Sequence, residues 1–292
     1  MSFTFLYNIV IIICIVLVFF IGIELLKARN PNSEGPRLSS DLSRPLFGSI
    51  QDRKTGYMII EDLINEKDVM YILKLWENKN YHDIKRYFLR NHVINKKMKN
   101  ILSNDYELID YVYIIENSAI HTYHRDYTSS RVYNNLKYPS YTMILYLDDN
   151  NSGLNIIPGS HDDNSSIYIK DKSVRLNVNK GSAILFDADI LHAGSAIDVD
   201  TKRHCIQFKI IHKEDIEKLP HLLNYYVLIN RPNNKSHFLK NIETGFTKHV
   251  PIFMDTFNDS IKSSFVEEKT PLQKWISSLV FSNKDFYKPI RI

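Results

Sequence analysis

Apolar residues change their spacing along this chain, and each change indicates a different kind of structure. From Ile9 to Ile23 every residue is apolar or Gly, and the wider segment Phe5–Leu26 is long enough to span a bilayer. Between about residues 61 and 102, apolar positions such as Val69 and Ile72 recur at helical spacing. The pattern predicts one N-terminal transmembrane helix, followed later by helices that pack on a sheet.

From about residue 106 to residue 211 the apolar residues come in short runs, rich in β-branched and aromatic side chains. Turn clusters such as Asp148–Gly153 and Asn179–Gly181 separate these runs. The predicted strands are Tyr111–Ile115, Tyr141–Leu147, Leu154–Ile157, Ile167–Ile169, Val174–Val178, Ala183–Phe186 and Cys205–Ile211. Their number and close spacing favour a mainly β fold with flanking helices, a sandwich or barrel, and a double-sheet jelly roll fits both the number and the lengths.

These patterns divide the chain into four predicted parts. A transmembrane anchor over 1–27 is followed by a linker over 28–50, which contains the Pro-rich stretch Asn30–Pro36. The jelly-roll domain with its N-terminal helices occupies 51–212, and a C-terminal flanking extension occupies 213–292. Partial helices are expected in this extension at Asp215–Val227, Thr256–Ser264 and Pro271–Phe281.

The charges beside the apolar segment predict its orientation. Lys27, Arg29 and Arg37 follow it, and no basic residue precedes it. A cleaved signal peptide would have a basic leading region and a small-residue cleavage site, whereas Leu25–Arg29 offers a poor one. We therefore expect a single-pass membrane protein, with the membrane as its partner and the C-terminal domain on the cytoplasmic side.

Composition excludes some other classes of protein. The net charge is only +4, and no run of Lys and Arg interleaved with aromatic residues is present, so we expect no binding to nucleic acid. The two cysteines are Cys14 in the apolar segment and Cys205 in a predicted core strand. A disulfide between them is implausible, so cysteine usage gives no sign of an oxidising compartment.

The main candidate for chemistry is the triplet His124-Arg125-Asp126, followed much later by His192. Residues two apart on a strand point to the same face, so His124 and Asp126 are expected side by side. Two imidazoles and one carboxylate on one face of an octahedron leave three positions open. That arrangement suits non-haem Fe(II), which must also admit a cosubstrate and O2.

A second triplet, His161-Asp162-Asp163, is a weaker candidate for the same role. His192 lies 66 residues after Asp126 but only 29 after Asp163, and the shorter interval has room for only part of a jelly roll. His161 also closes a turn, instead of lying within a strand. We therefore predict that the metal ligands are His124, Asp126 and His192.

Arg203 follows His192 by eleven residues and opens a predicted strand. In this strand Arg203, Cys205 and Gln207 share one face, while the opposite face is mostly apolar and suits packing beneath the helices. An inward-pointing guanidinium would bind the distal carboxylate of a dicarboxylate cosubstrate through its planar fork of donors.

The order of these motifs resembles the phytanoyl-CoA dioxygenase family over roughly residues 110–211. The motifs are His124-x-Asp126, Gly153–His161 (GLNIIPGSH), Gly181–Phe186 (GSAILF), Leu191–Ser195 (LHAGS) and Arg203. The resemblance implies a double-stranded β-helix that uses Fe(II), 2-oxoglutarate and O2 to hydroxylate a substrate, with release of succinate and CO2. It also implies that His124, Asp126 and His192 bind the iron and that Arg203 binds the cosubstrate.

The chain also departs from the family pattern. The family often has an aromatic residue where this chain has Ile144, and Tyr146 or Thr142 on the same strand face is expected to contact the cosubstrate instead. The stretch Tyr141–Leu147 is similar to the corresponding strand of prolyl 4-hydroxylases, so no subfamily is assigned. Asp126 is present, which favours a hydroxylase over a halogenase-like site. No catalytic residue is predicted beyond the metal site.

Other functions fit the residues less well. The triplet His124-Arg125-Asp126 also occurs in protein kinases, but the Asn expected five residues later is Arg131 here. A zinc hydrolase would have no use for Arg203. The open alternative is a non-catalytic, membrane-tethered jelly roll for binding or structure. The abundance of Asn, Ile, Lys and Tyr would suit a large virus, so this alternative includes a virion-associated protein.

The spare histidines His121, His204 and His212 are expected to be structural or surface residues. His121 lies three residues before His124, so on an extended strand it faces the other way. The sequence leaves the substrate open among a small molecule, a lipid and a protein side chain.

Overall fold

The computed structural model describes the chain from residue 50 onward, with gaps. The described residues are 50–116, 120–126, 128–129, 136–149, 153–163, 167–168, 172–195, 203–222, 226–229, 233, 235–252, 254–255, 271, 274–275, 278, 282 and 289–291. The predicted transmembrane helix lies outside them, as does almost all of the predicted linker. No helix within the described ranges is long and apolar enough to cross a membrane.

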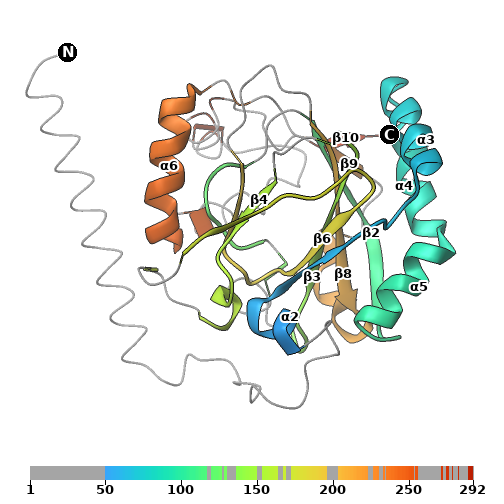
Figure 1. Cartoon of the computed structure of the whole chain (residues 1–292), viewed down its shortest axis with the longest axis horizontal. Coiled ribbons are helices and arrows are strands. Elements are labelled where there is room, and N and C mark those ends of the chain that lie inside the picture. The colour runs from blue at the N-terminus through green and yellow to red at the C-terminus, as the bar shows by residue number, and fades with distance from the viewer. Residues whose placement is uncertain are drawn as a thin grey trace, which may run out of the picture. The chain divides into compact units, whose positions relative to one another are not determined.

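Two β-sheets form the centre of the domain (Figure 1). The large sheet has the order β1-β6-β3-β8-β2-β9-β10, and the small sheet has the order β5-β4-β7. The strands of the large sheet are β1 (Tyr57–Ile60), β2 (Tyr106–Glu116), β3 (Tyr141–Tyr146), β6 (Ala183–Asp187), β8 (His204–His212), β9 (Tyr226–Ile229) and β10 (Pro289–Arg291). Those of the small sheet are β4 (Leu154–Ile156), β5 (Val174–Leu176) and β7 (His192–Gly194). The predicted combination of sheets with flanking helices is confirmed, and the arrangement is consistent with a double-stranded β-helix.

The alternation of side chains in β8 explains how the large sheet separates two cores. Ile206, Phe208 and Ile210 point to an outer core, which they share with apolar residues of the helices. Cys205 points the other way, into an inner core shared with residues of both sheets, such as Ile156 of β4. Both faces of the large sheet are therefore covered, and the inner core lies between the two sheets.

Three helices cover the outer face of the large sheet: α3 (Glu66–Glu77), α4 (Tyr81–Arg90) and α5 (His92–Ile101). Each helix begins after an Asn whose side-chain oxygen accepts a hydrogen bond from a backbone N–H of the first turn. These caps are Asn65, Asn80 and Asn91. The prediction of helices over 61–102 is confirmed, and the positive φ of Lys79 lies at the turn between α3 and α4. A short helix, α2 (Ile50–Thr55), precedes β1.

The C-terminal part of the chain returns to the sheets (Figure 1). Two 3₁₀ segments, η3 (Lys213–Lys218) and η4 (Pro220–Leu222), lead to β9, which pairs in parallel with β2, and β10 pairs with β9. The expected partial helix over Asp215–Val227 is correct only for the 3₁₀ segments, because its last residues enter a strand. Thr256–Ser264 lies outside the described residues.

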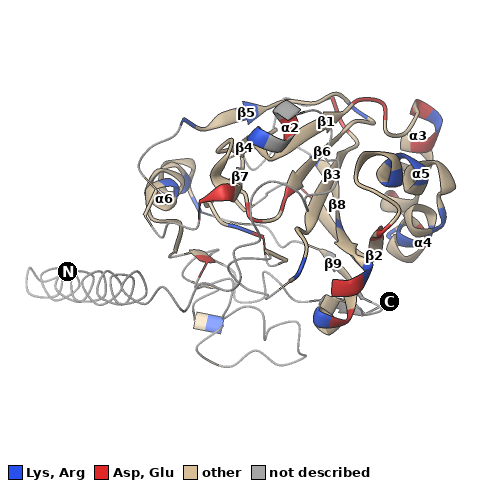
Figure 2. Cartoon of the chain, turned by 90° about the horizontal axis from the view of Figure 1, so that it is seen from below, with Lys and Arg blue, Asp and Glu red and all other residues tan. Residues whose placement is uncertain are grey.

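Helix α6 (His237–His249) is on the opposite side of the domain from α3, α4 and α5, beside β4 and β7 (Figure 2). Its C-terminal end contacts the region that was predicted as the strand Ile167–Ile169. The prediction is wrong for the described residues Ile167 and Tyr168, which lie in no strand. The backbone N–H of Tyr168 donates instead to the carbonyl of His249 at the end of α6.

Candidate metal centre

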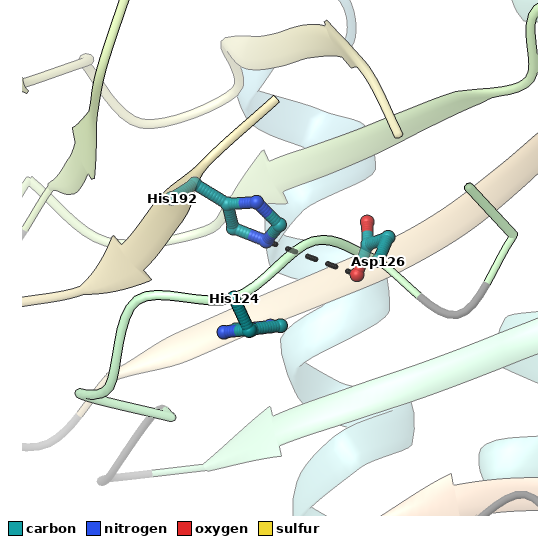
Figure 3. A group of neighbouring side chains, drawn as sticks. All are labelled: His124, Asp126 and His192. Carbon is teal, nitrogen blue, oxygen red and sulfur yellow. Dashed lines mark ion pairs between the residues drawn. The ribbon is translucent and has the colours of Figure 1, made fainter. Parts of the chain in front are cut away.

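The structure brings His124, Asp126 and His192 together as one buried group (Figure 3). Their potential ligand atoms all lie within 4.8 Å of one another. Nε2 of His192 lies 3.8 Å from Oδ1 of Asp126, and the centroids of the two imidazole rings are 4.5 Å apart. Within the described ranges this is the only group of three or more His, Cys, Asp or Glu side chains that could hold a metal ion.

Backbone pairing places these side chains. His124 and His192 form an antiparallel bridge, in which each backbone N–H donates to the other residue's carbonyl at 3.1 Å. The N–H of Asp126 donates to the carbonyl of Ala188 at 2.9 Å. The segment that carries two of the three residues therefore lies along β7 and the turn before it, which brings residues distant in sequence to one point.

Each imidazole is oriented by the backbone carbonyl two residues before it. Nδ1 of His124 lies 2.8 Å from the carbonyl oxygen of Thr122, and Nδ1 of His192 lies 3.0 Å from that of Ile190. Because a carbonyl can only accept, Nδ1 carries the proton in both rings. In the neutral form of either ring, Nε2 then keeps its lone pair, and this is the form that binds a metal.

The second oxygen of Asp126 has two partners of its own. Oδ2 accepts a hydrogen bond from the Thr142 hydroxyl and forms an ion pair with Nζ of Lys209 at 2.7 Å. Lys209 also donates to Thr142 at 2.8 Å, so the three side chains form a closed buried network. Oδ1 is then the oxygen that faces His192, and the network holds the carboxylate in that orientation.

Lys209 is the residue of this centre that the sequence analysis missed. It belongs to the same strand face as Arg203, Cys205 and Gln207, two positions after the last of these. Lys209 pairs directly across the sheet with Thr142 of β3. The alternation of the strand could therefore have identified it, since a Lys on a buried inner face requires an anionic partner.

Charges in the centre favour the forms that bind metal. Burial raises the pKa of Asp126, but Lys209, His192 and His124 lower it by more, so the carboxylate is ionised. Burial lowers the pKa of His192 to about 4, against the opposing effect of Asp126, so this imidazole is neutral at pH 7. Burial also lowers the pKa of Lys209, while the neighbouring carboxylate raises it.

Arg203 lies at the other end of the same strand face and is 1% exposed. Its Nε donates to Sγ of Cys205 at 3.3 Å, and Nη2 lies 3.5 Å from the hydroxyl of Tyr146. The guanidinium carbon also lies 5.6 Å from the centre of the Tyr146 ring. Its remaining nitrogen, Nη1, has no hydrogen-bond partner among the described residues. A buried guanidinium with an unused donor fits the carboxylate of a small acid.

Thr142 and Tyr146 lie at opposite ends of the inner face of β3, with Ile144 between them. Thr142 contacts the metal-binding carboxylate and Tyr146 contacts Arg203. Thr142 thus lies at the metal-binding end of the candidate site, and Tyr146 lies at the end that contains Arg203. Their contact with a cosubstrate stays a prediction.

Four further histidines are not part of this group. His161 is buried in a short 3₁₀ segment, η2 (Ser160–Asp162), whereas the side chain of Asp162 is 54% exposed. His121 pairs with Glu243, His204 pairs with Asp148, and the ring of His212 stacks on Tyr138. All four have structural contacts.

Comparisons with known proteins place the chain among enzymes. A family model described as phytanoyl-CoA dioxygenase matches residues 61–205, about half of the chain. No curated protein matches the chain significantly. Among solved structures, the "non-heme alpha ketoglutarate dependent epimerase SnoN from nogalamycin biosynthesis" is 14% identical. The match covers 56% of this chain and 80% of that one, with a TM-score of 0.45. HygX from Streptomyces hygroscopicus "with iron bound" is 12% identical over 55% of this chain and 83% of that one, also at a TM-score of 0.45.

Proposed function

The chain belongs to the phytanoyl-CoA dioxygenase family of Fe(II)- and 2-oxoglutarate-dependent enzymes, and on that premise we propose that it is a membrane-anchored hydroxylase with a double-stranded β-helix core. In this proposal His124, Asp126 and His192 bind the iron. The observation that carries it is the convergence of two Nε2 atoms and one carboxylate oxygen, while Nδ1 and Oδ2 are engaged elsewhere.

The protein's own residues prepare the site for these cofactors. Iron and 2-oxoglutarate, when bound, supply the oxidation of a substrate C–H bond by O2. The carbonyls of Thr122 and Ile190 fix the imidazole rings, and Lys209 with Thr142 fixes the carboxylate. The ligands are then held in place before the metal arrives, which reduces the entropic cost of binding it.

We assign the distal carboxylate of 2-oxoglutarate to Arg203. The unused Nη1 and the adjacent Tyr146 hydroxyl together offer donors to a carboxylate. Burial strengthens such a charge-assisted hydrogen bond, because water does not compete for the guanidinium. Loss of this interaction would cost about 1.5–3 kcal/mol, or roughly a 10- to 150-fold weaker binding of the cosubstrate.

We also propose that the domain is tethered to the cytoplasmic face of a membrane. The unbroken apolar run Ile9–Ile23 and the basic residues after it support this location. A predicted linker of only 23 residues, over 28–50, joins this run to the domain. The active domain would therefore work close to the bilayer surface.

The test is an anaerobic titration of the full chain, in detergent, with Fe(II) and then 2-oxoglutarate. The wild type should develop the metal-to-ligand absorption band of the ternary complex. Arg203→Ala should need a roughly 10- to 150-fold higher cosubstrate concentration for the same band. Arg90→Ala, which removes an exposed Arg from the end of α4, is the matched control and should behave like the wild type.

Two results would count against the proposal. Equal titrations for the wild type and Arg203→Ala would remove the cosubstrate assignment. A wild-type protein that binds neither iron nor 2-oxoglutarate would leave the non-catalytic jelly roll as the better account.

A further inference from the structure

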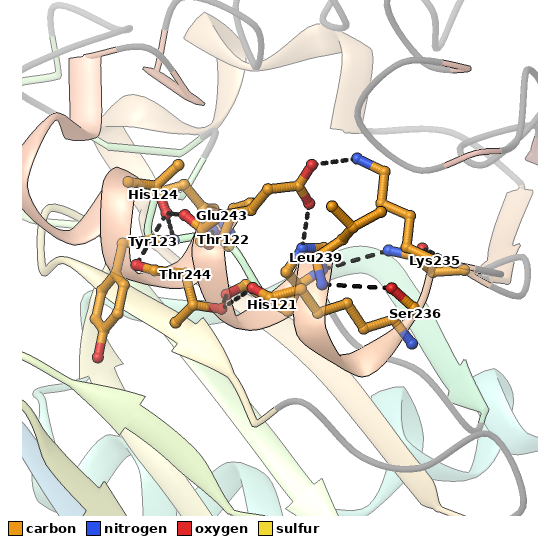
Figure 4. Close-up of polar contacts among 12 residues, drawn as sticks. His121, Thr122, Tyr123, His124, Lys235, Ser236, Leu239, Glu243 and Thr244 are labelled. Atoms are coloured by element: carbon orange, nitrogen blue, oxygen red, sulfur yellow. Dashed lines mark hydrogen bonds and ion pairs between the residues drawn. The ribbon is translucent and has the colours of Figure 1, made fainter.

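We propose that α6, together with Asn233, Lys235 and Asp255, forms a brace that positions the metal-binding segment 121–126, although these residues lie beyond the part of the chain that matches the family. The inference rests on the iron site proposed above. It is carried by hydrogen bonds between two regions that are more than a hundred residues apart in sequence (Figure 4).

The first part of the brace is a pair of threonines on α6. The hydroxyl of Thr244 donates to the carbonyl of His121 at 2.8 Å, and the backbone N–H of Tyr123 donates to the hydroxyl of Thr247 at 2.9 Å. These bonds fix the backbone on both sides of Thr122. The carbonyl of Thr122 is the group that orients the His124 imidazole, so α6 acts on the metal ligand through one intervening residue.

The second part is the side chain of His121, which is 1% exposed. Its Nε2 lies 2.7 Å from Oε2 of Glu243, and its Nδ1 lies 3.3 Å from Nδ2 of Asn233. Lys235 contacts the other oxygen of Glu243. The imidazole is thereby held on both of its nitrogens by the C-terminal region.

The third part acts on the residue between the two ligands. Asp255 accepts from the backbone N–H of Arg125 at 3.0 Å and from Nη1 of its side chain at 2.8 Å. Nη2 of Arg125 donates to the carbonyl of Asp163 at 2.8 Å. Arg125 and Asp255 are both buried. One carboxylate therefore holds the main chain and the side chain of Arg125, while its neighbours His124 and Asp126 face the metal.

These contacts complete a segment that is otherwise supported from one side. On that side, β7 and the turn before it bond to the backbone of Ile120, His124 and Asp126. On the other side, α6 and Asp255 bond to residues 121, 123 and 125. From residue 123 to residue 126, successive residues thus bond in turn to the brace and to β7 or the turn before it, which fixes both the position and the rotation of the segment.

Asp255→Asn, Thr247→Val and Glu243→Gln test the brace in the full chain. We expect each variant to bind Mn(II), measured by electron paramagnetic resonance, about 10- to 100-fold more weakly than the wild type, as for other groups that orient metal ligands. Asp255→Glu should recover part of the affinity. Asp110→Asn is the control, because it also removes a carboxylate from a buried cation, Lys85, but within the α4–β2 region.

Thermal unfolding of the metal-free proteins separates positioning from folding. If Asp255→Asn does not fold, Thr247→Val still tests the brace, because it removes one hydrogen-bond acceptor at nearly constant side-chain volume. Variants that fold and bind Mn(II) within twofold of the wild type overturn the brace while the proposed iron site stands. A wild type that binds no Mn(II) overturns the iron site and the brace together.

Discussion

Replacing Lys209 by Met tests whether Lys209 compensates the negative charge of the buried Asp126 carboxylate. Lys209 is 2% exposed, and its ammonium lies 2.7 Å from Asp126 and 2.8 Å from Thr142. Met has a similar length and fills the same space without a charge. The substitution therefore leaves the Asp126 carboxylate buried and deprived of its cationic partner.

The magnitude follows from that uncompensated charge. Removal of one partner from a buried ion pair costs about 3–5 kcal/mol in the free energy of unfolding. In a domain of this size each kcal/mol lowers Tm by about 2–4 °C, so the metal-free variant should melt roughly 6–20 °C below the wild type. A bound divalent cation restores positive charge next to Asp126. Saturating Mn(II) should therefore raise Tm more in the variant than in the wild type.

Differential scanning fluorimetry with and without Mn(II) measures both effects. Lys85→Met is the matched control, since Lys85 is a buried Lys that pairs at 2.6 Å with Asp110. The control should lower Tm without changing the shift caused by metal. The reasoning fails if metal-free Lys209→Met is as stable as the wild type. It also fails if Mn(II) raises Tm equally in Lys209→Met and Lys85→Met.

Three other predictions concern separate parts of the structure. Phe208→Ala should lower the free energy of unfolding, measured in urea, by about 3–5 kcal/mol. The reason is that the Phe208 ring packs beneath α4, with its centroid 4.6 Å from that of Phe88, and a loss under 1 kcal/mol would contradict this packing. Burial raises the pKa of Glu243, but its hydrogen bonds lower it by more, so the pKa lies below the ordinary 4.5. The ionised carboxylate therefore contributes its full stabilisation above pH 4.5, and this contribution is lost as the pH falls through the pKa of the folded state. Glu243→Gln should therefore show a smaller loss of stability on acidification below about pH 4.5 than the wild type, and equal losses would exclude the ion pair. His192→Ala should abolish the rise in Tm that Mn(II) causes in the wild type, and an unchanged rise would place the metal elsewhere.

The sequence predicted the two faces of β8 because polar and apolar residues largely alternate between Arg203 and Ile210. Ile206, Phe208 and Ile210 face the helices, as expected from their spacing. The spacing of His124 and Asp126 likewise predicted that they lie together. Such short-range periodicity follows directly from the geometry of a strand, so it can be recognised without knowing the fold.

Other features depended on contacts between distant residues and left little local signal. The strand β9 has only four residues, and its parallel partner β2 lies more than a hundred positions earlier in the chain. The contact of Arg125 with Asp255 joins residues 130 positions apart. A single Asp within the mostly apolar stretch 250–257 gives no indication of its partner, so the brace could not be predicted from the sequence alone.

The long sequence separation within the metal centre has a consequence for biosynthesis. A ribosome releases His124 and Asp126 early, but Thr247 and Asp255 emerge only when most of the chain has been made. Until then the nascent segment has its contacts with β7 on one side only. A domain of this design would acquire its metal late in translation or after it, since the ligands reach their final orientation only once the C-terminal region has folded back onto them.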